Sequence, residues 1–296
     1  MTDGTTLRFV QLADPQFGQF ARFSGISDEE IERFQRHKLN VKKASKITHF
    51  KNEEVRFSRA IAHAIEVDPA FVVVCGDMIN TPGAANEVAA VKRIAAGLPE
   101  AIPIFWTPGN HDVCGDTVRP SDESIAAYRA DFGDDYHSFD HGDSTFVVLN
   151  SCVLQRPENV PGELDRQMKF VESTLRSARS RGAKHIISFM HHPLFLDHPE
   201  EPDEDLPFAP SPPNQEPGYW TVPRVRRMPL LELFRQYGVE AVFAGHWHRN
   251  HYTSDGAMLM ISTGAVGYPL GDDPSGYRVV ELTDGGVRHT YHTLET

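Results

Sequence analysis

Five short apolar runs in the sequence are each followed within a few residues by aspartate, asparagine or histidine. The runs are rich in β-branched and aromatic residues, which is typical of buried strands. The runs and the polar residues after them are 7–13 with Asp14, 71–75 with Asp77, 102–106 with Asn110, 185–190 with His191, and 239–244 with His246 and His248. Because the carboxyl ends of strands in an α/β sheet converge on one crevice, the pattern predicts that these side chains lie together.

Helical patterns alternate with the apolar runs. They cover about 53–66, 84–97, 121–131, 162–181 and 229–237, and a further apolar run at 145–150 indicates a sixth strand. Gly182 and Gly238 follow the last two helical patterns, where a helix often ends in glycine. The alternation predicts a layered α/β fold, and the apolar stretches after residue 257 follow one another without helices, which predicts a mostly β end.

Taken alone, each polar residue at a strand end has an ordinary explanation. An aspartate after a strand is usually a turn residue or a helix N-cap, and the pair His191-His192 is more typical of a surface. The complete series is more specific, because Gly-Asn-His-Asp at 109–112 is uncommon and the His-x-His pair at 246–248 has the spacing of metal ligands. The combination of carboxylate, amide and imidazole groups favours a metal site.

The order Asp-x-Gln, Gly-Asp, Gly-Asn-His-Asp, His-His-Pro and Gly-His-x-His over residues 7–250 resembles the calcineurin-like metallophosphoesterase superfamily. Residues 13–18, 132–139 and the tail are similar to its subgroup of calcineurin-like phosphoesterase domain-containing proteins. The resemblance implies a four-layer α/β/β/α sandwich with two mixed sheets and flanking helices. Long stretches of weak pattern at about 19–52 and 197–229 are then lid-like insertions in a single domain over 1–296.

The resemblance also implies a set of metal ligands, namely Asp14, Gln16, Asp77, Asn110, His191, His246 and His248. Asp77 is expected to bridge two metal ions. Asp14 and His248 then hold the first ion, and the asparagine and the other two histidines hold the second. Gln16 stands where the family commonly has histidine, and its neutral amide oxygen is a harder donor. The first ion is then expected either to bind less tightly or to be Mn²⁺ or Mg²⁺ by preference.

The resemblance gives two further residues a part in catalysis. His111 is expected to face the phosphate without binding metal, while Asp112 orients its ring. Two ions of Mn, Fe, Zn or Mg would neutralise the phosphate and generate a metal-bridging hydroxide as the nucleophile. His111 would then either donate a proton to the leaving oxygen or stabilise the equatorial oxygens of the phosphate.

The expected function is hydrolysis of phosphate esters at a binuclear metal centre. A phosphomonoesterase is favoured, and the subgroup suggests activity of the serine/threonine phosphoprotein phosphatase type. A phosphodiesterase acting on cyclic nucleotides or other small diesters is the alternative. A non-catalytic metal-binding scaffold is the third reading, although such scaffolds lose ligands that this sequence keeps.

Charge and composition limit the kinds of partner that the protein is expected to bind. The formal net charge of −12 argues against nucleic acid held by electrostatics. The N-terminus lacks the basic and apolar regions of a signal peptide, and no apolar run is long enough for a membrane span. Cys75, Cys114 and Cys152 form no close pair and are expected to be reduced thiols. These features predict a cytoplasmic protein whose partner is a phosphate-ester substrate, either a small molecule or a phosphoprotein.

Overall fold

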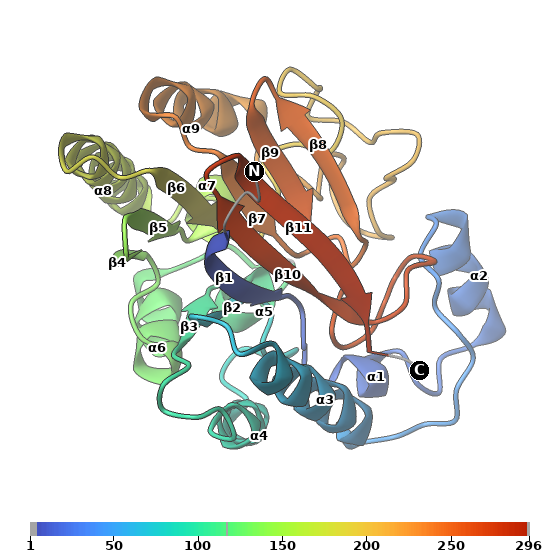
Figure 1. Cartoon of the computed structure of the whole chain (residues 1–296). Helices are drawn as coiled ribbons and strands as arrows, with labels where there is room; N and C mark the ends of the chain where they lie inside the picture. Colours follow the sequence, from blue (N-terminus) through green and yellow to red (C-terminus); the bar gives the residue numbers. More distant parts are fainter. Residues whose placement is uncertain (1–4, 117, 295–296) are drawn as a thin grey trace.

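Two sheets form the centre of the computed structural model, which describes residues 5–116 and 118–294 (Figure 1). The strands of the first sheet lie in the order β11 (Gly286–Thr293), β10 (Gly276–Thr283), β1 (Thr5–Leu12), β2 (Val72–Cys75) and β3 (Ile104–Thr107). β1, β2 and β3 are parallel, whereas β10 is antiparallel to both of its neighbours. The sheet is therefore mixed.

The second sheet is also mixed. Its strands lie in the order β4 (His137–His141), β5 (Ser144–Val148), β6 (His185–Phe189), β7 (Ala241–Ala244), β9 (Met258–Ser262) and β8 (His251–Asp255). The four inner strands are parallel, and the two edge strands are antiparallel to their neighbours. All six predicted strands are present, within a few residues of their expected ends, as β1, β2, β3, β5, β6 and β7.

Helices cover the outer face of each sheet, which confirms the predicted four-layer α/β/β/α sandwich (Figure 1). The first sheet is covered by α3 (Lys51–Val67), α4 (Ala85–Ala95) and α6 (Asp122–Phe132), with the short α5 (Asn110–Val113) beside them. The second is covered by α7 (Ser151–Gln155), α8 (Pro161–Ser180) and α9 (Arg224–Tyr237). None of the described helices is long and apolar enough to cross a membrane.

Phenylalanine rings fill the space between the two sheets. Phe9 of the first sheet stacks on Phe71, with ring centroids 4.9 Å apart. The edge-to-face partners of Phe9 come from the second sheet: Phe146, Phe189 and Phe243, at 5.5–5.8 Å. Such aromatic contacts add to the free energy gained by burial. They hold the two sheets together, so that the ends of β1, β2, β3, β6 and β7 face the same crevice.

The two predicted insertions pack against each other. The first contains α1 (Gln19–Arg22) and α2 (Asp28–Arg36), and a capping box between Ser27 and Glu30 begins α2. Both insertions contribute to one apolar cluster, which includes Phe23, Ile31, Leu39, Val41, Ala209 and Trp220. Arg33 donates to Asn214 Oδ1 at 2.6 Å, and Lys38 donates to the carbonyl of residue 207 at 2.8 Å. The insertions therefore form one unit.

Candidate metal centre

Two groups of side chains that could bind a metal ion meet where the strands of both sheets end. Within each group, the ligand atoms all lie within 4.8 Å of one another. One group is Asp77, His191 and His246, and the other is Asp14, Asp77 and His248. All five residues are buried. Because Asp77 belongs to both groups, the arrangement fits two adjacent metal ions that share one carboxylate.

Two amide side chains point into the same region. Asn110 Oδ1 lies 3.1 Å from His191 Nε2, while its Nδ2 donates to Asp116 Oδ1 at 3.0 Å, so the oxygen side of this amide faces the ligands. Gln16 lines a cavity beside these side chains, and its buried Oε1 has no hydrogen-bond partner among the described residues. Burying a carbonyl oxygen without a partner costs free energy. Both amide oxygens therefore fit a site that holds metal ions.

Backbone strain is concentrated at the predicted ligands. Eight non-glycine residues of the described chain have positive φ, and five of them are predicted metal ligands: Asp14, Gln16, Asp77, His246 and His248, at 38–67°. Side chains other than glycine rarely adopt this left-handed conformation, and it persists where the surroundings enforce it. Such strain is typical of a functional site whose side chains must point in one direction.

Two motif glycines allow the ligand loops to approach each other closely. A Cβ atom at Gly109 would overlap Asp77, and one at Gly76 would overlap the ring of His191. Asp77 comes from the end of the neighbouring strand β2, and His191 comes from the end of β6 in the other sheet. The glycines of Gly-Asp and Gly-Asn-His are therefore required by the packing of the ligands themselves.

For His191 and Asp77, attraction between opposite charges shifts the pKa more than burial does. Burial lowers the pKa of His191, but Asp77 and Asp14 outweigh burial and raise it to about 9. Burial also acts against ionisation of Asp77, yet His191 and His111 hold the pKa of this carboxyl below its usual range. His191 would therefore have to lose a proton in order to hold a metal ion. In contrast, burial keeps the pKa of His246 well below its usual value, so this imidazole is neutral.

His111 lies beside the ligands, but its ring partners differ from the prediction. Its Nδ1–H donates to the carbonyl of Asn80 at 2.7 Å, and Nε2 lies 2.9 Å from Asp116 Oδ1. The carboxylate of Asp112 instead accepts from three backbone N–H groups at 2.8–3.2 Å, those of Met78, Ile79 and Gly109. This corrects the expected role of Asp112: it joins the loops after β2 and β3, because its short side chain folds back onto the start of α5.

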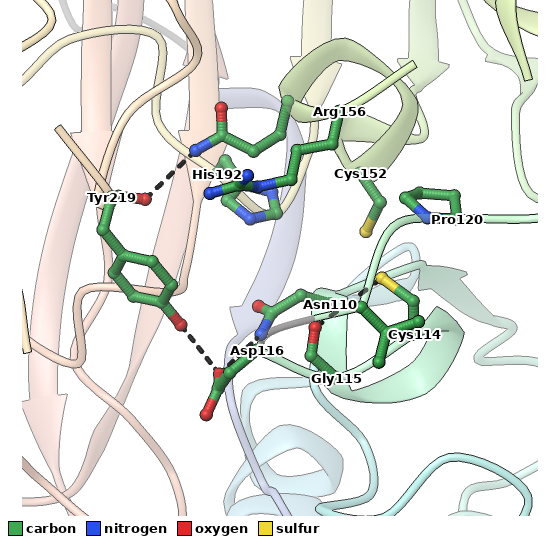
Figure 2. Close-up of a pocket in the computed structure, with 11 residues that line it drawn as sticks. Asn110, Cys114, Gly115, Asp116, Pro120, Cys152, Arg156, His192 and Tyr219 are labelled. Carbon is green, nitrogen blue, oxygen red and sulfur yellow. Dashed lines mark hydrogen bonds between the residues drawn. The ribbon is translucent and has the colours of Figure 1, made fainter. Parts of the chain in front are cut away.

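Asp116 lies at the centre of these contacts, although the sequence did not indicate it. Figure 2 shows its carboxylate between the side chains of Asn110 and Tyr219. It also accepts from Arg22 Nη2 at 2.7 Å and from the Tyr219 hydroxyl at 2.8 Å. Together with its contacts to Asn110 and to His111 Nε2, the Asp116 carboxylate therefore orients four polar groups at the centre.

A cavity of about 150 Å³ lies over the ligands and beneath the two insertions. Its walls include Asp77, His111, His246 and His248, and residues 212–215 of the second insertion. Tyr219 and Trp220 both line the cavity, but Trp220 is only 4% exposed and its Nε1–H donates to the carbonyl of residue 210. Of the aromatic residues in this insertion, Tyr219 is therefore well placed to meet a substrate.

His192, the neighbour of the ligand His191, has a supporting position. Its Nδ1 forms a hydrogen bond with Ser151 Oγ at 2.9 Å, and its ring centroid lies 4.2 Å from that of His246. It therefore packs behind a predicted ligand, as expected for a structural residue.

Residues 7–250 match the model of one protein family, described as calcineurin-like phosphoesterase. The chain belongs to this family. The predicted family is confirmed, and so is the predicted class of enzyme: this calcineurin-like phosphoesterase is a metal-dependent phosphoric ester hydrolase.

Relatives and solved structures agree with this assignment. Serine/threonine-protein phosphatase CPPED1 of Homo sapiens is 32% identical over 295 residues, which cover 97% of this chain and 83% of the relative. The protein of the same name from Danio rerio is 30% identical and covers 97% of this calcineurin-like phosphoesterase and 84% of its own length. The structure of a dimetal phosphatase from Danio rerio has a TM-score of 0.61 at 13% identity, covering 98% of this chain and 97% of that one, which supports the fold.

Proposed function

We propose that this phosphoesterase holds two metal ions that share Asp77. The proposal places Asp14, Gln16 and His248 at the first ion, with Asn110, His191 and His246 at the second. Its support is the pair of ligand groups with Asp77 in common, together with the buried amide oxygen of Gln16 that has no partner among the described residues. The mixed oxygen and nitrogen donors fit ions of Mn, Fe, Zn or Mg.

The proposed reaction is hydrolysis of phosphate monoesters, with phosphorylated serine or threonine as the substrate class. The observation that carries it is the position of His111 in the wall of the cavity, beside the two ligand groups. Relatives over nearly the whole chain are named serine/threonine-protein phosphatases, which supports this class of substrate. A cavity beneath two insertions suits an extended side chain carrying a phosphate.

His111 is suited to protonate the leaving group. When bound, two metal ions neutralise phosphate charge and make water a nucleophile at neutral pH. Burial lowers the pKa of His111, but Asp116 and Asp77 outweigh burial and raise it to about 9, so the ring is protonated near neutral pH. Its Nδ1–H is committed to the carbonyl of Asn80, so the proton for the alkoxide would come from Nε2, which faces Asp116 Oδ1 at 2.9 Å.

A comparison of chromogenic substrates tests this function. With Mn²⁺ bound, the protein is expected to hydrolyse p-nitrophenyl phosphate and phosphoserine peptides with a higher kcat/KM than bis(p-nitrophenyl) phosphate. A higher value for the diester would support the phosphodiesterase alternative. Metal-loaded protein that hydrolyses none of these compounds would support a metal-binding scaffold.

Gln16→His is expected to change metal preference at the first ion. Imidazole is a softer donor than an amide oxygen, so affinity for Zn²⁺ should rise relative to Mn²⁺ by roughly 10- to 100-fold, the range seen when a supporting group of a metal site changes. Competition between the two metals, followed by metal analysis, measures the change. Gln16→Ala serves as the comparison, and equal metal preferences in all three proteins would exclude Gln16 as a ligand.

A further inference from the structure

Among the described residues that line the cavity, Arg22 is the only arginine or lysine. The cavity wall also contains the carboxylates of Asp77 and Asp116, and the whole chain carries a formal net charge of −12. An anionic substrate that enters this surface needs local positive charge. Arg22 is thus the one permanently charged cation that the described cavity wall offers to a phosphate.

Arg22 contacts Asp116 and His111 directly, and Tyr219 supports it through Asp116. It is the last residue of α1, in the first insertion. Its Nη2 donates to Asp116 Oδ2 at 2.7 Å, and its Nη1 lies 3.5 Å from His111 Nε2. Tyr219, from the second insertion, donates its hydroxyl to the other oxygen of Asp116. The guanidinium is therefore fixed beside the proposed proton donor.

The guanidinium also retains access to the cavity. The Arg22 side chain is 41% exposed, whereas that of Asp116 is 14% exposed. A guanidinium has five N–H donors in a planar fork, so it can hold a carboxylate and a phosphate oxygen at the same time. Since Nη1 lies 3.5 Å from His111 Nε2, a phosphoryl group that His111 reaches is also within reach of Arg22.

We propose that Arg22 is the specificity-determining residue of this site, contacting a terminal oxygen of the substrate's phosphoryl group and selecting monoesters over diesters. Asp116 and Tyr219 are positioning residues that hold the guanidinium in place. The inference rests on the proposed phosphoesterase function and adds the group that distinguishes the two classes of substrate.

Charge and the number of terminal oxygens explain the selection. A phosphate monoester carries about −1.5 to −2 charges near neutral pH and has three terminal oxygens, whereas a diester carries one negative charge and has two terminal oxygens. Coulombic attraction to a guanidinium increases with the charge of its partner. Hydrogen bonds between charged groups are also stronger than those between neutral groups. Arg22 should therefore stabilise a bound monoester more than a bound diester.

Arg22→Gln tests the proposal with two independent measurements. In Mn²⁺-loaded protein, kcat/KM for p-nitrophenyl phosphate is expected to fall by about 10- to 100-fold, as for loss of a hydrogen bond between charged groups, and calorimetric binding of inorganic phosphate should weaken by a similar factor. The value for bis(p-nitrophenyl) phosphate should change much less. Arg36→Gln is the matched control, because it makes the same change at an exposed arginine of the first insertion that does not line the cavity.

The outcomes distinguish failure of the proposal for Arg22 from failure of the proposed function on which it rests. Equal losses of kcat/KM for both esters, or phosphate binding that does not depend on Arg22, would overturn the role of Arg22. Hydrolysis by the wild type would still uphold the proposed function. A wild type that binds phosphate through Arg22 but hydrolyses neither ester would overturn the function instead. Tyr219→Phe adds a further test: positioning through Asp116 predicts a smaller loss than Arg22→Gln, again greater for the monoester, with unchanged metal content.

Discussion

Replacing Asp77 with alanine is expected to release both metal ions and to lower kcat for a phosphate monoester by at least about 10³-fold. Asp77 is the one residue present in both ligand groups, so its loss removes a ligand from each ion. Its carboxylate also lies 3.3 Å from His191 Nε2 and accepts from the backbone N–H of His111 at 2.9 Å. Metal analysis after dialysis, combined with a rate measurement, tests this expectation.

Two further variants make the Asp77 experiment specific. Asp77→Asn can still accept the hydrogen bond from His111 while losing the negative charge, so it should keep the fold and lose metal. Asp143→Ala changes an exposed aspartate just before β5, at the opposite end of that strand from the site, and should leave metal content and rate unchanged. If Asp77→Ala retained two metal ions per chain, the result would contradict the proposal that both ions share Asp77.

Replacing His111 with alanine is expected to leave both metals in place and to lower kcat by roughly 10²- to 10⁴-fold. His111 belongs to neither ligand group, and the hydrogen bonds of its ring go to the carbonyl of Asn80 and to Asp116. The loss should be greatest for substrates with poor leaving groups, such as phosphoserine peptides. It should be smaller for p-nitrophenyl phosphate, because nitrophenolate leaves without a proton.

The dependence on the leaving group is what distinguishes proton donation by His111 from a structural role. A structural role predicts equal losses on both substrates and a reduced metal content. His141→Ala is the control, because His141 is an exposed histidine at the end of β4. Turnover that is unchanged in His111→Ala would exclude the residue from the reaction.

The fold was largely predictable because its signal is local. Buried strands such as β2 and β7 are short, continuous apolar runs, and each is followed by a motif of glycine and polar residues. The helix α2 was not predicted, since the first insertion has no regular apolar pattern. Its stability depends instead on a capping box at Ser27 and on Ile31, which is buried against the second insertion.

The grouping of the side chains that could bind metal was also predictable, because each follows a strand, but the residues that support them were not. Asp116 lies in a Gly-Asp turn after α5, and such pairs are too common in turns to indicate function. Its partners Arg22 and Tyr219 are 94 and 103 residues away in the sequence. Only packing of the two insertions brings these three residues together. Asp112 is expected to orient the His111 ring because the two residues are adjacent in the sequence. The sequence does not show that Asp116 lies closer to this ring.

The central claim, a shared two-metal site that hydrolyses monoesters, is tested most directly by titrating metal-free protein with Mn²⁺ while following hydrolysis of p-nitrophenyl phosphate. Two ions that share Asp77 predict no activity without metal and a plateau of activity at two equivalents of Mn²⁺ per chain. Full activity at one equivalent, or activity in the metal-free protein, would contradict the claim.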